Sequence, residues 1–194
     1  MTESWLAQPI LVGRHVRLEP LRPEHAAGLL AAADDPTLFQ WTSVAIRELG
    51  DAEQFVADAL DDPNRLAYAQ LEPQSGTVLG TTSYYQIEPR YRSLAIGYTW
   101  ISRATQGTSV NPEAKFLLLR RAFDELGAVR VEWHTDELNA QSRGAIAKLG
   151  AEFEGLLRKH RRRADGSWRT TALFAMTDED WPPARARLQA RILP

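Results

Sequence analysis

The chain has 194 residues, of which 44% are hydrophobic and 25% are charged, and its formal net charge at pH 7 is −2. This composition is typical of a globular protein, and the near-neutral charge gives no overall attraction to nucleic acid or to an anionic membrane. The absence of cysteine excludes disulfides, thiolate metal sites and a cysteine nucleophile. The four histidines, at positions 15, 25, 134 and 160, lack the spacing of a metal site, so we expect no bound metal.

The N-terminal segment 1–9 lacks the basic stretch followed by an apolar run that a signal peptide requires. No apolar run in the sequence approaches the roughly 18 residues of a membrane-spanning helix. We therefore expect a cytoplasmic protein that does not bind a membrane. Because no repeat or low-complexity linker divides the chain, residues 1–194 are expected to form a single domain.

The first half of the chain alternates between the two periodicities of secondary structure. Alternating apolar and polar residues indicate strands, and apolar residues three or four positions apart indicate helices. Proline and paired aspartates end both helical stretches. We predict, in order, a strand over 11–19, helices over 23–33 and 51–60, and three antiparallel strands between 66 and 102.

The second half continues with a helix over 112–126, a strand over 129–135, a helix over 139–149, two strands joined by an Asp165-Gly166 turn, and a helical tail from about residue 178. This order predicts an α/β (α+β) fold with a mixed, mostly antiparallel sheet of about seven strands flanked by helices. Parallel pairing is expected only across the helix 112–126, because that connection alone is a βαβ unit of the core.

The start of the helix 112–126 is well marked. Asn111 is a suitable N-cap and Pro112 suits the first helical position. The polar loop before it brings free backbone N–H groups to a helix N-terminus, where those donors and the helix dipole both favour a phosphate. The plainer interpretation is a well-capped helix with nothing bound, which Glu113 favours because an acid in the first turn already complements the dipole.

Several stretches of the chain occur in an informative order: LVGRHVRLEPLRPEHAAGLL, AIGYTWI, NPEAKFLLLRRAF, LGAEFEG and LLRKHRRRADGSWRTTALFAMTDEDW. Together they resemble the GNAT acetyltransferases, and among these the RimJ- and RimL-like N-acetyltransferases, over nearly the whole chain. The resemblance implies a GNAT-like sheet that is splayed at the strands 93–101 and 129–135. It also implies transfer of an acetyl group from acetyl-CoA to a primary amine by direct attack in a ternary complex.

The resemblance also implies a CoA site. In this family the loop reads Gln or Arg, two residues, Gly, one residue, then Gly or Ala, and its amides bind the CoA pyrophosphate. Gln106 matches the first position, whereas Ser109 and Asn111 stand where small residues are usual and Gly107 is shifted to the neighbouring position. The implied CoA contacts are Trp100 and Ile101 with the pantetheine arm, and Gln106, Gly107, Thr108, Ser109, Val110 and Asn111 with the pyrophosphate.

The candidate catalytic residues follow the next strand. Asn139 and Ser142 match family positions that contact the pantetheine and approach the sulfur, so Ser142 is the candidate acid for the departing thiolate. The same N-x-x-S spacing also fits ordinary helix capping, which is compatible with a cofactor contact for Asn139. No general base stands out; Asp136, just past the strand, is a candidate to hold a water or the amine, and a solvated carboxylate is the plainer interpretation.

Four residues are candidates for the acceptor side: Trp41, Tyr84, Glu88 and His134. Core packing is the plainer use of the aromatic residues, and a solvated surface position is the plainer use of the other two. Alternation along the strand 129–135 places His134 on the same face as Glu132.

The acceptor itself is constrained by its pKa. An N-terminal α-amine with a pKa of about 7.7 to 8.0 is roughly 10% neutral at pH 7, whereas a lysine amine is neutral to less than about 0.1%. A site without a strong base therefore favours a protein N-terminal α-amine or a small-molecule amine.

Three alternatives stay open. The basic run from Arg158 to Arg163 is typical of a solvated strand face, with nucleic acid or the CoA 3′-phosphate as the alternative partner. The chain is also compatible with a homodimer. A non-catalytic acyl-CoA-binding or interaction module is the main alternative to an enzyme.

Overall fold

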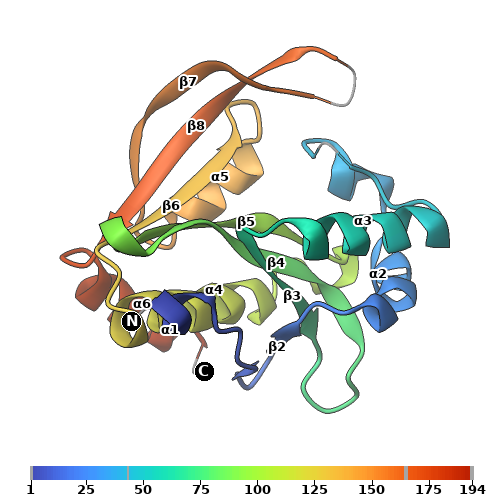
Figure 1. The fold of residues 1–194 in the computed structure, drawn as a ribbon, viewed down its shortest axis with the longest axis horizontal. Coiled ribbons are helices and arrows are strands. Elements are labelled where there is room, and N and C mark those ends of the chain that lie inside the picture. Colours follow the sequence, from blue (N-terminus) through green and yellow to red (C-terminus); the bar gives the residue numbers. More distant parts are fainter. Residues whose placement is uncertain (1, 43, 164–165, 193–194) are drawn as a thin grey trace.

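The fold was examined in a computed structural model, which describes residues 2–42, 44–163 and 166–192. Its centre is a sheet of eight strands in the order β1-β2-β3-β4-β5-β6-β8-β7 (Figure 1). The strands are β1 (Leu11–Val12), β2 (Arg17–Pro20), β3 (Arg65–Leu71), β4 (Val78–Glu88), β5 (Ser93–Ile101), β6 (Arg130–Asp136), β7 (Glu152–Arg162) and β8 (Trp168–Thr177). Neighbouring strands are antiparallel except β5 and β6, which are parallel. The predicted mixed sheet is thus confirmed.

Helices cover both faces of this sheet. They are α1 (Thr2–Leu6), α2 (Ala26–Ala32), α3 (Leu49–Asp61), α4 (Val110–Arg120), α5 (Ala140–Ala147) and α6 (Trp181–Ile192). Adjacent residues of β3 divide between the two apolar clusters, as the alternation of a strand requires: Tyr68 packs in the cluster of α4 and α6, and Ala67 and Ala69 pack under α2 and α3. Figure 1 shows α4 and α6 together on one side, away from α2 and α3.

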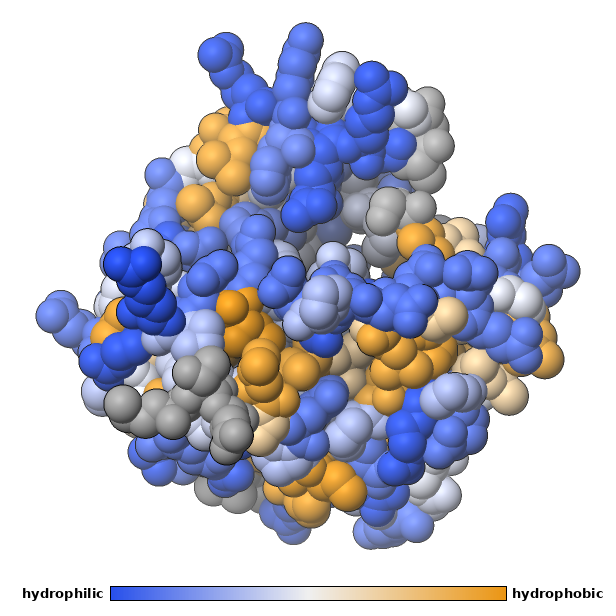
Figure 2. All heavy atoms as spheres, in the orientation of Figure 1, coloured by the Kyte–Doolittle hydropathy of each residue, from blue (hydrophilic) through white to orange (hydrophobic). Residues whose placement is uncertain are grey.

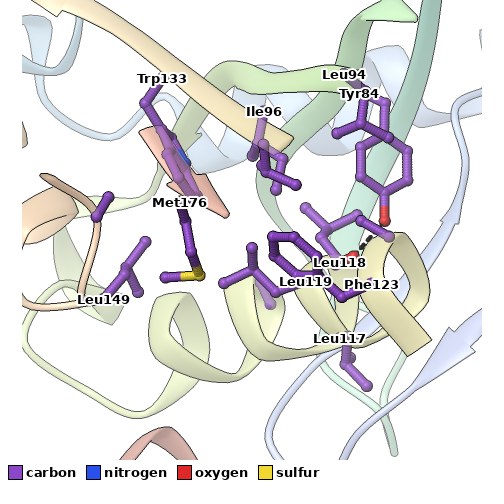
Figure 3. Packing of buried hydrophobic residues seen from close by; sticks show 14 of the residues in the cluster. Tyr84, Leu94, Ile96, Leu117, Leu118, Leu119, Phe123, Trp133, Leu149 and Met176 are labelled. Atoms are coloured by element: carbon purple, nitrogen blue, oxygen red, sulfur yellow. Dashed lines mark hydrogen bonds between the residues drawn. The ribbon is translucent and has the colours of Figure 1, made fainter. Parts of the chain in front are cut away.

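The larger cluster lies between α4 and the sheet. Leu117, Leu118 and Phe123 of α4 and the turn after it face Ile96 of β5 and Trp133 of β6 (Figure 3). These side chains have less than a tenth of their surface exposed. Burial of each large apolar side chain contributes about 1.5 to 3 kcal/mol, so this layer fixes α4 firmly against β5 and β6.

The predicted strand 11–19 is wrong, because the segment forms a hairpin of β1 and β2 instead. A carboxylate that is distant in sequence captures its turn: Glu113 accepts hydrogen bonds from the backbone N–H groups of Arg14 (2.9 Å), His15 (2.5 Å) and Val16 (3.0 Å). Gly13 closes the turn with a bond to the carbonyl of Val16. The sheet therefore has eight strands rather than about seven.

Helix boundaries also differ from the prediction. The N-cap of α4 is Ser109 and not Asn111, and the helix continues past Arg120 as a π-helical turn over Arg121–Glu125. The predicted helix 23–33 begins with a 3-10 turn over Pro23–His25 before α2. Of the predicted Asp165-Gly166 turn, Asp165 lies outside the described residues. No helix in the described ranges is long and apolar enough to cross a membrane.

The contacts of Glu113 predict a measurable contribution to stability. In Glu113→Gln the amide keeps one acceptor oxygen and turns an N–H₂ group toward backbone donors. We expect the free energy of unfolding to fall by about 2 kcal/mol, as for a lost charge-assisted hydrogen bond. Urea unfolding measures this change, with Glu53→Gln on the exposed face of α3 as the control. Equal stability of the two variants would show that the carboxylate does not hold the hairpin.

Candidate active site

The site is organised by the separation of β5 from β6. The two strands pair only where Ser93–Ala95 lies beside Arg130–Glu132. Beyond these residues no pairing connects the described parts of β5 and β6, although both strands continue, to Ile101 and Asp136. The splayed strands that the sequence led us to expect are therefore present. Backbone groups along this edge of β5 have no strand partner.

A β-bulge in β5 accounts for the separation. Gly97 and Trp100 of β5 pair with Ser83 and Thr81 of β4, so β5 has one more residue than β4 over this interval. Within it, Tyr98 has a positive φ of 50°. A bulge bends its strand and increases the local twist. It therefore carries the second half of β5 away from β6 while the pairing with β4 continues.

The loop after β5 presents free donors at the start of α4. Among the described residues, the backbone amides of Gly107, Ser109 and Asn111 have no hydrogen-bond acceptor. Gly107 has a φ of +79°, a conformation that favours glycine. The side-chain oxygen of Asn111 is buried without a partner. Because the Glu113 carboxylate is bound to the β1–β2 turn, it does not occupy these donors.

The same loop contacts the first turn of α5. The side-chain oxygen of Gln106 accepts a hydrogen bond from Gln141 at 3.2 Å. Asn139 is the N-cap of α5, as its spacing predicts, and its side chain accepts from the amide of Ser142 at 3.0 Å. The predicted cofactor residues of the loop and of α5 are thus neighbours. The Ser142 side chain is half-buried beside them.

Trp100 and Ile101 hold the end of β5 through their side chains. Trp100 packs edge-on against Phe39 and Phe55 in the cluster under α2 and α3, with ring centroids 5.3 and 6.5 Å away. Ile101 is buried in the cluster of α4. Any contact that these two residues make with a cofactor must therefore come from their backbone groups.

A chain of polar side chains lies where the strands begin to separate. Tyr85 of β4 is paired with Ala95, and its hydroxyl lies 2.8 Å from Nδ1 of His134. Nε2 of His134 lies 3.3 Å from a carboxylate oxygen of Glu132. These contacts fit a neutral imidazole whose Nε2–H donates to Glu132 and whose Nδ1 accepts from Tyr85.

The surroundings fix the charge of two members of this chain. The pKa of Glu132 is lowered to about 2, mainly by the hydrogen bond from His134. Burial opposes this shift, and the hydrogen bond and the charge of Arg130 add to it. Burial raises the pKa of Tyr85. At neutral pH the imidazole of His134 therefore links the neutral phenol of Tyr85 to the ionised carboxylate of Glu132.

Two of the predicted site residues lie elsewhere. Tyr84 has the opposite orientation from Tyr85: it is buried in the core, and its hydroxyl donates to the carbonyl of Leu118 at 2.5 Å, so it cannot contact a substrate (Figure 3). Glu88 is exposed at the end of β4 that turns into β5, away from the loop 102–109. Both residues are removed from the site.

Asp136 is also unsuited to be a base. It is buried, and it binds the Arg163 guanidinium at 2.7 and 3.1 Å and the amide of Leu138 at 3.0 Å. Burial alone would raise its pKa, but the hydrogen bond from Arg163 and the other partners outweigh it, and the pKa of Asp136 is lowered. This carboxylate fixes the end of the β7–β8 hairpin rather than accepting a proton.

A pocket of about 460 Å³ opens beside these residues, between the β7–β8 hairpin and the segment before α3. Its lining residues are Trp41, Thr42, His160, Arg161, Arg162, Arg163, Trp168 and Arg169. Figure 2 shows the surface hollowed between the largely hydrophilic hairpin and the segment that precedes α3. The His160 ring lies 6.0 Å from the His134 ring, which places the pocket next to the polar chain. Of the predicted acceptor residues, Trp41 thus lines the pocket, and His134 lies behind His160 outside its lining.

Sequence reasoning missed Lys115, a buried residue of α4. Its ammonium nitrogen donates to the hydroxyls of Thr82 (2.9 Å) and Thr99 (2.6 Å), next to the bulge of β5. Burial lowers the pKa of Lys115 from 10.5 to about 7. The signal was present in the sequence, because Lys115 stands three residues before Leu118 and so falls on the apolar face of the helix.

Comparison with known proteins places this geometry in a class. The fold, a mixed and mostly antiparallel sheet flanked by helices, is that of an acetyltransferase. The family model described as an acetyltransferase (GNAT) domain matches residues 15–152. The chain therefore belongs to the GNAT acetyltransferase family.

Solved structures agree with this assignment. The chain is similar to a GCN5-related N-acetyltransferase from Brucella melitensis, with 31% identity, a TM-score of 0.92, and coverage of 97% of this chain and 87% of that one. A protein from T. thermophilus described as an acetyltransferase is 37% identical, with a TM-score of 0.89 and coverage of 96% and 98%. RimJ of Mycobacterium smegmatis, solved with CoA-disulfide, is 25% identical, with a TM-score of 0.77 and coverage of 96% and 95%. No curated protein matches the chain.

The depressed pKa of Lys115 predicts how stability depends on pH. The unfolded chain keeps this lysine protonated up to about pH 10.5, whereas the folded protein holds it neutral above about pH 7. Proton binding between these limits therefore favours unfolding, so stability falls as the pH drops from 10 to 7. In Lys115→Met this loss disappears, and we expect the variant to gain on the order of 3 kcal/mol over the wild type between pH 9.5 and pH 7.

Urea unfolding of the wild type and of Lys115→Met at both pH values measures the difference, in which the other titrating groups cancel. A difference between the two proteins that does not change with pH would mean that Lys115 stays charged in the folded protein.

Proposed function

We propose that the protein transfers an acetyl group from acetyl-CoA to a primary amine by direct attack. The observation that carries this proposal is the adjacency of two features: the unpaired edge of β5 beyond Ala95, and the free amides of Gly107, Ser109 and Asn111 at the start of α4. Unpaired backbone groups along a strand edge favour a peptide-like ligand, and amides at a helix N-terminus favour phosphate. The pantetheine arm and the pyrophosphate of CoA combine these two chemistries in one molecule.

The residues present fit this co-substrate despite the unusual loop sequence. Ser109 and Asn111 replace small residues, but both have helical or near-helical backbone, and their amides stay free. The buried side-chain oxygen of Asn111 offers an acceptor in addition. Gln106 joins the loop to α5, which brings Asn139 and Ser142 toward the same ligand.

The reaction also requires control of two protons. The amine nitrogen bonds to the acetyl carbon and loses a proton, and the carbon–sulfur bond breaks as the sulfur gains one. We assign the first proton to the chain of Tyr85, His134 and Glu132. The amine gives its proton to the Tyr85 oxygen as the phenol proton passes to Nδ1 of His134, and the Glu132 carboxylate stabilises the resulting imidazolium. Ser142 is assigned as the donor to the sulfur.

The acceptor is inferred to be a protein N-terminal α-amine or a small-molecule amine of low pKa. Such an amine is partly neutral at pH 7, so the proton relay formed by Tyr85, His134 and Glu132 is sufficient to deprotonate it. The similarity to RimJ of Mycobacterium smegmatis supports a RimJ/RimL-like member of the family. A protein that only binds acyl-CoA is the competing function, which the replaced loop glycines favour.

Release of free thiol decides between these functions. The protein is incubated with acetyl-CoA and a panel of α-amino peptides, amino acids and small amines, and thiol is measured together with the acetylated product by mass spectrometry. We expect thiol release that depends on the amine. Binding of CoA without turnover on any amine would identify a binding module, and acetylation restricted to lysine side chains would contradict the low-pKa acceptor.

The relay predicts a specific effect of two substitutions. His134→Gln and Tyr85→Phe each interrupt the path of the amine proton, and we expect kcat/KM to fall by about 100-fold, within the range of general-base catalysis. His15→Gln on the β1–β2 turn is the matched control. A His134→Gln enzyme with an unchanged kcat/KM would exclude the relay.

A further inference from the structure

The pocket beside the relay is lined by four arginines and by no carboxylate among the described residues. The arginines are Arg161, Arg162, Arg163 and Arg169. We infer that the acceptor amine carries an oxyanion, a carboxylate or a phosphate, and that Arg161 and Arg169 bind this group. The inference rests on the proposed acetyl transfer and names the substrate class of that site.

Arg161 and Arg169 bring two positive charges together on the hairpin. The two residues are direct partners across the β7–β8 hairpin. Like charges in opposed positions of a sheet destabilise it, so such a pair needs an anion nearby. Yet no carboxylate in the described ranges forms an ion pair with either residue. Nε of Arg169 is buried without a hydrogen-bond partner, and burial lowers the pKa of this guanidinium.

Neighbouring arginines of the same region show how the charge is balanced elsewhere. Arg163 is bound by Asp136 at 2.7 Å, and Arg130 is bound by Glu154 at 2.8 Å. Arg162 lies over the Trp168 ring, 4.6 Å from its centroid. Arg161 and Arg169 form no ion pair with a carboxylate of the described residues; the charge of Asp136, which is bound to Arg163, acts on Arg169 without such a pair. We therefore assign the ligand to Arg161 and Arg169.

Arg161 and Arg169 also lie near the residues of the proposed relay. The charges of Arg161 and Arg169 both act on the pKa of Tyr85 and on the pKa of His160, so they lie close to the proposed relay. The His160 ring connects the pocket to His134. An oxyanion held by these arginines would thus belong to a molecule whose amine is within reach of Tyr85.

The volume and the lining of the pocket also favour a small ligand. A volume of about 460 Å³ is within the range of small-ligand sites, which is about 300 to 1,000 Å³. Trp41 and Trp168 border it on the two sides. Nucleic acid instead requires a long positive surface that follows the phosphate backbone, and the chain as a whole has a net charge of −2. A single oxyanion beside an amine therefore fits the pocket better than a polynucleotide.

The test compares amines that differ in one negative charge, with kcat/KM expressed per neutral amine because a nearby anion also raises the pKa of the amine. Each pair is assayed by thiol release: an amino acid against its amide, a peptide amide with Glu against Gln as its second residue, and phosphoethanolamine against ethanolamine. These pairs distinguish an α-carboxylate, an acidic side chain and a phosphate. For the wild type we expect kcat/KM at least tenfold higher for the charged member of one pair. Arg161→Gln and Arg169→Gln should each lose most of this preference, whereas the exposed Arg158→Gln keeps it.

The outcomes separate this inference from the function on which it rests. Thiol release with no preference for any charged acceptor would overturn the inference and leave acetyl transfer intact, and a preference that survives in both pocket variants would overturn it as well. Thiol release absent with every amine would contradict the proposed function itself.

Circular dichroism checks the folding of each variant; if Arg169→Gln does not fold, the exposed Arg161→Gln decides alone. Inhibition by a short RNA that Arg161→Gln abolishes, without any acceptor preference, would assign the arginines to nucleic acid and overturn the inference.

Discussion

The separation of β5 from β6 is the constraint on which the rest of this molecule depends. The parallel pairing ends after Ala95, the bulge at Tyr98 bends β5 away, and backbone groups along this edge of β5 have no strand partner. Such groups are costly unless a ligand binds them, so a gap of this kind is stable only when other contacts hold its walls. Lys115 ties α4 to Thr99 beside the bulge, and Trp100 anchors the far end of β5 on the opposite face of the sheet. The gap is thus held open from both sides.

The two groups of site residues lie on opposite faces of the sheet. On the α4 face, Glu113 turns its carboxylate to the β1–β2 hairpin, so the first turn of α4 keeps its amides free for an anionic ligand. On the other face, Tyr85 and His134 meet the pocket of the β7–β8 hairpin. In the proposed reaction, acetyl transfer takes place at the gap between β5 and β6. The arginine pair of the hairpin extends the second face toward a charged acceptor.

Sequence patterns predicted the parts of this structure that local periodicity determines. The order of strands and helices, the one parallel pair and the Asn139 cap all follow from alternation, helical spacing and capping chemistry. The β1–β2 hairpin did not, because the Glu113 carboxylate that creates it is about a hundred residues away in the chain. Alternation likewise separates Tyr84 from Tyr85 without showing which of them faces the core. Asp136 is unsuited to be a base because it binds Arg163, and no local pattern reveals this partner, which follows another strand.

Hydrogen–deuterium exchange tests the central claim, that the unpaired edge of β5 and the start of α4 form one acyl-CoA site. Exchange is compared with and without saturating CoA, with α6 (Trp181–Ile192) as the internal reference. The account requires slower exchange in peptides that cover Gly97–Ile101 and in those that cover the loop to Asn111, and no change in α6. Unchanged exchange in β5 when CoA is bound would contradict it, because the gap between the strands would then not be the place where the co-substrate lies.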